Sequence, residues 1–485
     1  MRSSALLGAH DAVGHLAWLA EGCSSPRQAS PVRFVTPEAP PEAVNSPKKI
    51  GEACRSRWGS FVAAVELRLA STKGTTVNTT NRWMALAALA FFACAPNPPR
   101  DAAWVAAWAT SPQFASTGLP GIPPAEPFQN QTVRQVIRPS FWGKTLRVRI
   151  SNDHGTRPLV IGGAAISPRT EGAKVDLAKM APLTVGGVSS FTLPAGTSTL
   201  TDAVDIRGWS EGDLAVDLYF PEHTGEPTWH WNGLETSYVS EEGNFAGAAE
   251  FPVRSETTSR YFLSGLEMDA PGATAIVAIG DSITEGAGST VNGRQRWTDV
   301  LDARLGDRPF AVLNHGIGGA RLLHDQVGPS ALQRFDRDVL APAGVKYVVI
   351  AFGLNDIGFW RFVNRPEENV DATQIIEGYR QLIARGREKG LKVIGATLTP
   401  IGGSVYELPD NEQKRQQVNA WLRQTAGSAE GFDAVIDFEG ALRDPEQPLR
   451  LRPEFDSGDH VHPNDAGYRA MAEAVNLGLF SDAGE

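Results

Sequence analysis

The spacing of the hydrophobic residues in this chain changes near Pro271, and this change limits the folds that the chain can adopt. Before that position, apolar and polar residues alternate, as residues 146–151 and 214–220 illustrate. After it, short uninterrupted apolar runs are separated by segments whose apolar residues have helical spacing. Alternation predicts strands with one face on a core, whereas apolar runs separated by helices predict a parallel sheet covered on both faces. The chain is therefore predicted to carry two fold classes in series.

Residues 101–268 have the first of these patterns, and we predict that they form an all-β, jelly-roll-like sandwich. Glycine and proline punctuate the alternating segments closely, and no long amphipathic helix is evident between them. Short half-buried strands separated by such turns are typical of a β-sandwich. The cluster Trp229-His230-Trp231 within this part is interpreted as packing or as a wall of a substrate site.

The second class extends over residues 269–485, where the pattern predicts an α/β domain. The uninterrupted apolar runs are 275–279, 311–313, 345–352, 392–397 and 434–436. Apolar residues at helical spacing follow the first run, from Trp297 to Leu305, and the third run, from Ile375 to Ile383. In parallel sheets of this kind, the functional site lies at the carboxyl ends of the strands.

Reactive side chains follow these runs. The blocks, in chain order, are Gly280-Asp281-Ser282-Ile283-Thr284, Asn314-His315-Gly316-Ile317-Gly318-Gly319, Gly353-Leu354-Asn355-Asp356 and Asp459-His460-Val461-His462-Pro463. Because a serine hydroxyl is a weak nucleophile, it needs a base, and a histidine oriented by a carboxylate supplies one. Ser282 is therefore the candidate nucleophile, His462 the candidate base, and Asp459 the carboxylate that orients it.

In the order and spacing of these blocks, residues from about 271 to 480 resemble a GDSL, or SGNH, hydrolase. The resemblance implies a three-layer α/β/α, flavodoxin-like domain that performs acyl transfer. It places the catalytic roles on Ser282, Asp459 and His462. It also implies an oxyanion hole formed by the backbone N–H groups of Ser282 and Gly319 and by the side-chain amide of Asn355. Such preorganised donors meet the negative charge that develops on the ester oxygen.

Each of these residues has a purely structural alternative. Ser282 could cap a helix, Asn355 could start one, and Asp459 could lie in a turn. The presence of all of them, in order and at the ends of successive strands, favours the catalytic interpretation. His460 is interpreted as structural or exposed, because the family pattern places catalysis on the histidine that precedes proline.

The resulting expectation is a serine esterase that hydrolyses carboxylic ester bonds through an acyl-enzyme. Its substrates are expected to be small-molecule or glycan esters, chiefly short-chain acetyl esters of carbohydrates, because the chain resembles xylan-esterase-like proteins in which a β-sandwich precedes the hydrolase domain. Two alternatives remain open. One is lipase-like or thioesterase-like hydrolysis of longer acyl chains. The other is a glycan-binding protein with a non-catalytic hydrolase scaffold, in which Trp209, Trp229 and Trp231 would stack on sugar rings.

The charge and the cysteine content limit which partners, metals and cofactors we expect. The formal net charge is -10, and residues 1–100 contain 11 Lys or Arg against 6 Asp or Glu, so the remaining residues contain 34 against 49. An acidic protein repels phosphate backbones, so we expect no nucleic-acid partner. All three cysteines lie in the first hundred residues and no His-Glu-x-x-His zinc motif occurs, so we expect neither a metal nor a cofactor.

Residues 1–100 are predicted to be a disordered export segment. Within it, residues 84–94 form an apolar run far shorter than the ~20 residues that span a bilayer, and this run ends at Cys94. The pattern is typical of a signal-peptide core and resembles a bacterial lipobox, which makes Cys94 a candidate for lipid attachment to a membrane. We expect translation to begin near Val77 or Met84, and the product to be exported to the bacterial periplasm or cell surface as a lipoprotein, or secreted.

Overall fold

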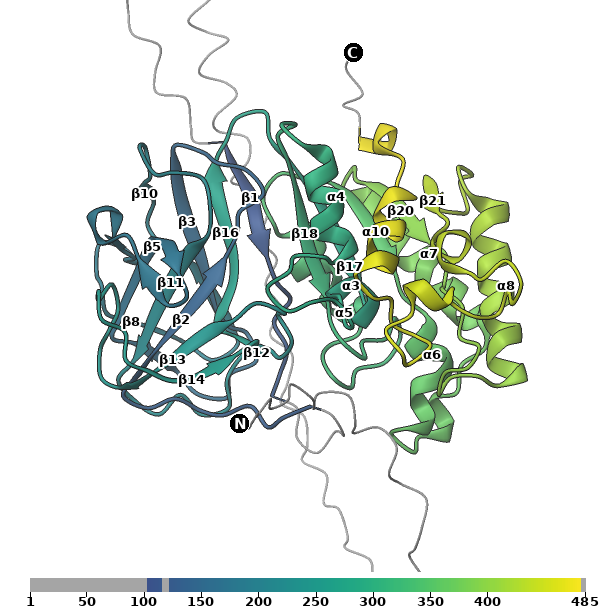
Figure 1. Ribbon diagram of the computed structural model, residues 1–485, viewed down its shortest axis with the longest axis horizontal. Coiled ribbons are helices and arrows are strands. Elements are labelled where there is room, and N and C mark those ends of the chain that lie inside the picture. Colours follow the sequence, from purple (N-terminus) through teal and green to yellow (C-terminus); the bar gives the residue numbers. More distant parts are fainter. Residues whose placement is uncertain (1–102, 116–121, 481–485) are drawn as a thin grey trace, which may run out of the picture. The chain divides into compact units, whose positions relative to one another are not determined.

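The computed structural model describes residues 103–115 and 122–480 (Figure 1). These residues fall within one compact unit, Ala102–Glu485. The expected export segment, its core at 84–94 and Cys94 lie outside the described residues, so those expectations and the division of the chain at residues 100 and 268 stay predictions. Within the described part of the chain, no helix combines the length and the apolar character that crossing a membrane requires.

The β-rich region, residues 103–115 and 122–269, is built from antiparallel strands (Figure 1). These are β1 (Trp104–Ala109), β2 (Gln131–Ile137), β3 (Thr145–Asn152), β4 (Leu159–Ile161), β5 (Gly163–Glu171), β6 (Lys174–Val175), β7 (Ala181–Pro182), β8 (Phe191–Leu193), β9 (Thr197–Leu200), β10 (Val204–Asp205), β11 (Leu214–Phe220), β12 (Trp229–His230), β13 (Ser237–Glu242), β14 (Val253–Thr257), β15 (Arg260–Tyr261) and β16 (Leu263–Asp269). One sheet has the order β1-β16-β3-β10, with β9 beside β3, and another has the order β14-β13-β2-β11-β5-β6, with β7 beside β5. The short pairs β12-β15 and β4-β8 complete the region.

Burial follows the predicted alternation in one strand and departs from it in another. In β3, the alternate apolar residues from Leu146 to Ile150 are buried and the side chains between them are half-buried. The same prediction is wrong for β11, which is buried along its length apart from Tyr219. The reason is an ion pair, because Asp217 accepts two hydrogen bonds of 2.7 Å from Arg134 on β2. A charge that is paired in this way can lie inside a protein.

The α/β region, residues 270–480, contains the predicted parallel sheet. Its strands are β17 (Thr274–Gly280), β18 (Phe310–Gly316), β19 (Val345–Ala351), β20 (Lys392–Ala396) and β21 (Ala434–Ile436). They pair in parallel in the order β18-β17-β19-β20-β21. Each strand overlaps one predicted apolar run, so the prediction of an α/β fold is confirmed. Because β18 and β19 lie on opposite sides of β17, the sheet has a switch point there, and a crevice forms at the carboxyl ends of strands at such points.

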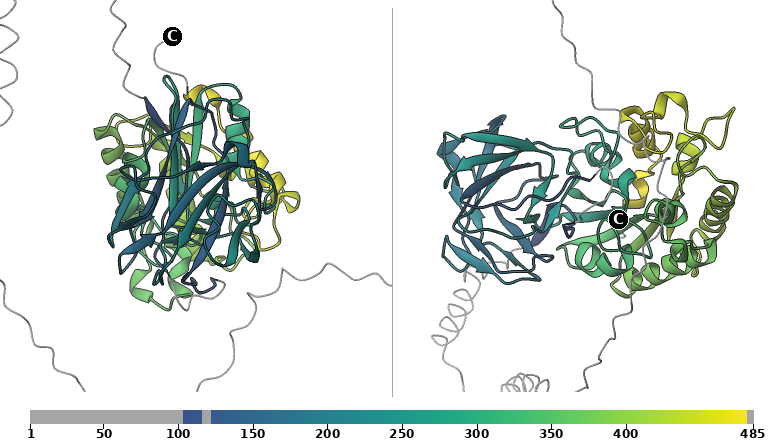
Figure 2. Two further views of the ribbon diagram at one scale, coloured as in Figure 1. Left: turned by 90° about the vertical axis from the view of Figure 1, so that its left-hand side faces the viewer. Right: turned by 90° about the horizontal axis from the view of Figure 1, so that it is seen from below.

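Helices flank this sheet (Figure 2). They are α3 (Ser282–Glu285), α4 (Trp297–Leu305), α5 (Ala331–Phe335), α6 (Leu354–Gly358), α7 (Ala372–Glu388), α8 (Pro409–Thr425), α9 (Phe438–Leu442) and α10 (Asp465–Glu473), with the short helices η2 (Asp336–Leu340), η3 (Phe359–Arg361), η4 (Pro366–Glu368), η5 (Pro453–Phe455) and η6 (Leu477–Phe480). A further short helix, η1 (Leu177–Lys179), lies in the β-rich region. Two of the α-helices, α4 and α7, coincide with the segments of helical spacing. Asp371 starts α7 by accepting a hydrogen bond of 2.9 Å from Gln374 N–H, and the buried residues Ile375, Tyr379 and Leu382 then form its inner face.

The β-rich region contacts the α/β region through β1 and the segment that follows it. Strand β1 lies against β18. Beyond β1, the buried Ser111 hydroxyl donates to the Asp338 carboxylate at 2.7 Å and accepts a hydrogen bond from Arg334 at 2.7 Å. Arg334 also donates to the backbone oxygen of Gly280 at 2.9 Å. A buried polar network therefore extends from the β-rich region to the end of β17.

Candidate active site

The candidate nucleophile lies at the carboxyl end of β17. Ser282 is the first residue of the one-turn helix α3, and the residue before it, Asp281, caps this helix by accepting a hydrogen bond of 3.0 Å from Ile283 N–H. The structural alternative, in which Ser282 is the helix cap, is therefore wrong. Burial raises the pKa of the Asp281 carboxyl to about 6, although the capping hydrogen bond opposes this shift.

The Ser282 hydroxyl faces the candidate base instead. His462 Nε2 lies 2.7 Å from Ser282 Oγ, and His462 Nδ1 lies 2.5 Å from Asp459 Oδ2. The other carboxylate oxygen, Asp459 Oδ1, accepts hydrogen bonds from the backbone N–H groups of Val461 at 3.0 Å and His462 at 2.8 Å. The structure thus joins Ser282, His462 and Asp459 in one continuous series of hydrogen bonds.

These contacts set the charge of Asp459 and the orientation of His462. Burial by itself would raise the pKa of Asp459, but the hydrogen bond and charge of His462, with the backbone N–H groups, hold that pKa below its ordinary value. An ionised carboxylate beside Nδ1 keeps a proton on that nitrogen, which leaves Nε2 able to accept the proton of the serine hydroxyl. The arrangement can therefore generate a serine nucleophile.

The neighbouring histidine has a different partner. His460 Nδ1 lies 2.5 Å from Asp456 Oδ2, and the His460 side chain is 48% exposed. Its φ of 63° is in the left-handed region, and its ring packs against Gly403, where a Cβ would lie 3.1 Å from the ring. His460 is thus an exposed side chain with a carboxylate of its own, close in sequence to His462.

The predicted oxyanion donors lie in two segments that touch. Asn355, in α6, donates from Nδ2 to the backbone oxygen of Ala320 at 3.0 Å, and its Oδ1 accepts a hydrogen bond of 2.7 Å from the Tyr406 hydroxyl. Because a donor occupies Oδ1, the amide is held with its NH₂ group toward the segment of Gly319 and Ala320. Gly319 has a φ of 74°, and a Cβ there would lie 2.7 Å from Val327 Cγ2, so glycine is required on both counts.

We call residues 316–323, which contain Gly318 and Gly319, the glycine loop. Asp356 holds its far end, because the two carboxylate oxygens accept hydrogen bonds from Leu322 N–H at 2.8 Å and Leu323 N–H at 3.0 Å. Burial raises the pKa of Asp356 to about 6, against the effect of those two bonds. Asp356 therefore fixes the loop beside which Asn355 lies.

Glu285 holds the near end of the glycine loop. This buried carboxyl accepts a hydrogen bond of 2.9 Å from Gly318 N–H and another of 3.0 Å from Asn232 Nδ2, which belongs to the β-rich region. The sequence interpretation identifies neither Glu285 nor Tyr406. A signal for Glu285 exists, since it lies three residues, about one helical turn, after Ser282. For Tyr406 there is no local signal, because 51 residues separate it from Asn355.

Other residues noted in the sequence take packing positions. Trp229 is buried and donates from Nε1 to the backbone oxygen of Phe114 at 3.1 Å. Trp209 and Trp231 are partly buried and pack against the core of the β-rich region. These placements support packing for all three tryptophans. Among residues 103–115 and 122–480, no group of three or more His, Cys, Asp or Glu side chains is arranged to hold a metal ion.

Comparison with known proteins places this site in a family. Residues 278–470 match the model of the GDSL-like lipase/acylhydrolase family. A curated acetylxylan esterase from Xylanibacter ruminicola is 25% identical over 214 residues, an alignment that covers 42% of this chain and 42% of that protein. The chain thus spans less than half the length of this relative.

Solved structures give matches that cover a similar share of the chain. A member of the lipolytic protein G-D-S-L family from Veillonella parvula is 22% identical, with 43% of this chain and 100% of that chain covered and a TM-score of 0.31. A carbohydrate acetylesterase family member from Sinorhizobium meliloti is 17% identical, with 41% of this chain and 94% of that chain covered and a TM-score of 0.33.

Proposed function

The chain belongs to the GDSL-like lipase/acylhydrolase family through residues 278–470, and from this premise we propose that it is a serine esterase that hydrolyses carboxylic ester bonds through an acyl-enzyme. The observation that carries the proposal is the series from Asp459 through His462 to Ser282, with contacts of 2.5 and 2.7 Å. That geometry is what a serine nucleophile with a general base requires.

Acylation begins when His462 Nε2 takes the proton of Ser282 Oγ while that oxygen bonds to the carbonyl carbon of the ester. The carbonyl electron pair moves onto oxygen, where the backbone N–H groups of Ser282 and Gly319 and the Asn355 amide stabilise the negative charge. When this intermediate collapses, the bond to the alcohol breaks, and the alcohol leaves with the proton from His462. Ser282 then carries the acyl group.

Deacylation repeats these steps with water as the nucleophile. His462 takes a proton from water as the water oxygen bonds to the acyl carbon, and the same donors stabilise the second oxyanion. Collapse breaks the bond to Ser282 Oγ, which recovers its proton from His462, and the carboxylic acid is released. Throughout, the low pKa of Asp459 keeps a negative charge beside the imidazolium that forms in each half-reaction.

As substrates we propose short acyl groups, chiefly acetyl, on carbohydrate alcohols. The name of the acetylxylan esterase relative supports this choice. We also propose that the β-rich region is a jelly-roll-like β-sandwich. In support, strands of both large antiparallel sheets, β3 and β11 among them, contribute to one hydrophobic core.

One observation favours a second candidate, the hydrolysis of longer acyl chains. Phe362 is 49% exposed and meets the ring of Tyr406 edge-on, with 5.7 Å between the ring centroids. Val405, which directly precedes Tyr406, is 58% exposed. Phe362 contacts Tyr406 and Val405 precedes it in the chain, so both apolar side chains lie around the residue whose hydroxyl binds Asn355, and there they would contact a longer acyl chain.

Hydrolysis of p-nitrophenyl acetate, butyrate and octanoate tests the proposal, with Ser282→Ala as the control. We expect activity that decreases with chain length and is lost in the variant, followed by release of acetate from acetylated xylan. A preference for octanoate would favour the second candidate. Activity that survives Ser282→Ala would refute the nucleophile, and inactivity of the unmodified chain on all three esters would favour the glycan-binding alternative.

A further inference from the structure

The buried carboxyl of Glu285 joins two parts of the molecule that the proposed reaction needs together. Glu285 is the last residue of the helical turn that Ser282 begins, and it is 2% exposed. Its Oε1 accepts a hydrogen bond of 2.9 Å from Gly318 N–H, and its Oε2 accepts one of 3.0 Å from Asn232 Nδ2. Gly318 directly precedes Gly319, whose N–H is a proposed oxyanion donor.

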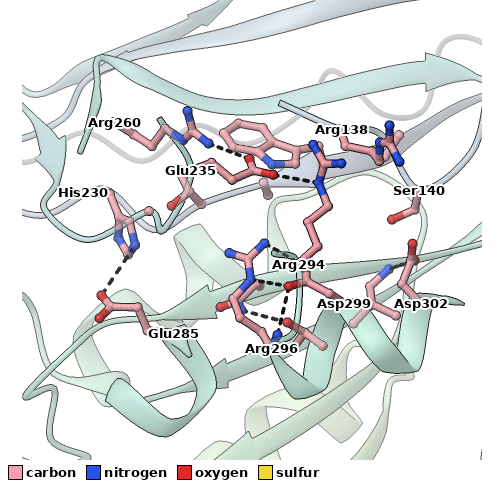
Figure 3. A pocket seen from close by; sticks show the side chains of 18 of the residues that line it. Arg138, Ser140, His230, Glu235, Arg260, Glu285, Arg294, Arg296, Asp299 and Asp302 are labelled. Atoms are coloured by element: carbon pink, nitrogen blue, oxygen red, sulfur yellow. Dashed lines mark hydrogen bonds and ion pairs between the residues drawn. The ribbon is translucent and has the colours of Figure 1, made fainter. Parts of the chain in front are cut away.

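The β-rich region surrounds this carboxyl with further contacts. His230 Nε2 lies 3.5 Å from Glu285 Oε1, and Figure 3 shows the two side chains facing each other along the wall of a pocket of about 320 Å³. The ring of Trp231 lies against Gly318, where a Cβ would lie 3.4 Å from that ring and 2.8 Å from Glu285 Oε2. Asn232, Trp231 and His230 are consecutive, so one short segment supplies all three contacts.

A second bridge from the β-rich region reaches the other side of Gly319. Gln113 accepts a hydrogen bond of 3.1 Å from Trp231 N–H at Oε1 and donates from Nε2 to the backbone oxygen of Val327 at 3.1 Å. Val327 is the residue whose side chain a Cβ on Gly319 would meet at 2.7 Å. The β-rich region therefore also binds, through Gln113, the residue whose side chain packs against Gly319.

The contacts around Glu285 favour a hydrogen-bonding role over a catalytic charge. Burial raises the pKa of Glu285 to about 8, and Arg296 and Asp281 act on it in opposite directions. Burial likewise lowers the pKa of His230 to about 3. Near neutral pH the facing pair is therefore uncharged, and Glu285 serves as an acceptor for one N–H group from each region. An apolar side chain there would leave both donors without that partner.

We propose that Glu285 is a positioning residue, which ties Gly318 to Asn232 and so lets the β-rich region set the position of the Gly319 N–H in the oxyanion hole. The inference rests on the proposed function and deepens it. The β-rich region then completes the active site, because the loop that supplies an oxyanion donor is anchored on its side chains.

The test compares Glu285→Leu with Glu285→Gln in the full chain, with p-nitrophenyl acetate as the substrate. Leucine removes the acceptor for Gly318 N–H, and a loop displaced by about 1 Å would lower kcat by about 100-fold. Glutamine keeps an acceptor oxygen and should retain kcat within about 5-fold, the equivalent of one hydrogen bond. KM should change less than twofold in both variants, because the proposed donor acts on the oxyanion and not on the bound ester.

Asn232→Ala tests the same tie from the β-rich region and does not alter Glu285 itself. We expect kcat to fall about 5-fold, since one hydrogen bond to the carboxyl is lost. The matched control is Asn244→Ala, another asparagine of this region, which is exposed and accepts a hydrogen bond of 3.1 Å from Ala246 N–H in its own turn. This control should leave kcat unchanged.

Hydrogen exchange of the glycine loop provides a readout that does not depend on turnover. Glu285→Leu should speed amide exchange in residues 316–323 the most, and Asn232→Ala and Glu285→Gln less, because each of these keeps an acceptor for Gly318 N–H. Asn244→Ala should not change it. Unchanged kcat and unchanged exchange in Glu285→Leu would overturn the inference, as would equal losses in the leucine and glutamine variants. If Glu285→Leu does not fold, unchanged kcat and exchange in Asn232→Ala would overturn it. An unmodified chain without esterase activity would reject the proposed function alone, and the exchange data would still decide whether Glu285 ties the loop to the β-rich region.

Discussion

Two buried carboxyl groups, one in each region of the molecule, are accommodated in different ways. In the β-rich region, Asp217 accepts two hydrogen bonds of 2.7 Å from Arg134, and the two side chains are 3% and 1% exposed. In the α/β region, Glu285 is buried against backbone and side-chain amides and an uncharged histidine. The first arrangement neutralises a charge inside a sheet, as folding requires. The second places an uncharged acid at a loop beside the nucleophile, and such perturbed groups are typical of functional sites.

This contrast also separates polar groups that support the fold from those that act in the reaction. In the α/β region, the candidate catalytic side chains follow the carboxyl ends of strands, where the switch point at β17 creates a crevice. In the β-rich region, Asn152 and Asn130 instead bind groups within the region, the backbone oxygen of Leu193 and the hydroxyl of Tyr219. Paired variants, in which one residue belongs to the proposed site and its match does not, can therefore test this difference.

The largest expected effect is that of His462→Ala, with His460→Ala as its neighbour control. Loss of the general base should lower kcat on the order of 10⁴-fold or more, because nothing else accepts the Ser282 proton. His460 pairs with Asp456 and is 48% exposed, so its replacement should change kcat less than twofold. Steady-state hydrolysis of p-nitrophenyl acetate measures both. Comparable losses in the two variants would show that the pair Asp456 and His460 takes part in the reaction.

The second comparison is between alanine variants of two buried asparagines, one in each region. Asn355→Ala should lower kcat by about 100 to 1000-fold with little change in KM, the size expected for one oxyanion donor. Asn152, 2% exposed in β3, donates to the backbone oxygen of Leu193 at 3.3 Å. Its replacement by alanine should lower the free energy of unfolding by about 1 to 3 kcal/mol and leave kcat unchanged. Urea unfolding and initial rates check both, and a rise in KM for Asn355→Ala would instead assign Asn355 to ground-state binding.

A smaller effect is expected when a hydrogen bond from a tyrosine hydroxyl to an asparagine is removed, and each region has one such bond. Tyr406 donates to Asn355 Oδ1 at 2.7 Å in the α/β region, and Tyr219 donates to Asn130 Oδ1 at 2.9 Å in the β-rich region. Tyr406→Phe should lower kcat about 5-fold, because the amide loses the donor that fixes its orientation. Tyr219→Phe should affect stability alone. If both variants retain full kcat, the orientation of Asn355 does not depend on Tyr406.

Features that follow from local sequence patterns could be predicted, whereas features that depend on residues far apart in the chain could not. The candidate triad and the α/β fold could be predicted, because parallel strands read as apolar runs and place the residues after them at one edge of the sheet. The burial of β11 could not, since Asp217 is made compatible with the interior by Arg134, which lies 83 residues away. The tie between Asn232 and Glu285 crosses 53 residues. Local periodicity carries no information on such pairs, because their register depends on how the strands and loops pack.

The smallest expected effect concerns the pH dependence of stability, which tests the uncharged state of Glu285. Burial raises its pKa from 4.5 to about 8, so near pH 7 the folded chain holds a proton that the unfolded chain has released. Because unfolding then releases this proton, stability should fall as the pH rises from about 7 to about 8. Buried His230 and His315, with pKa values lowered to about 3 and about 4, are mostly neutral in both states over this window. The raised pKa of Asp281, about 6, acts mainly below it.

Glu285→Gln has no proton to release, so its melting temperature should decline less steeply than that of the unmodified chain between about pH 7 and pH 8. The difference in slope corresponds to at most about one proton, which is why this effect is the smallest of the series. Differential scanning calorimetry at several pH values in this window measures it. Parallel profiles would mean that Glu285 is ionised in the folded chain throughout, and the contrast with the ion-paired Asp217 would then lose its basis in charge and rest on hydrogen bonding alone.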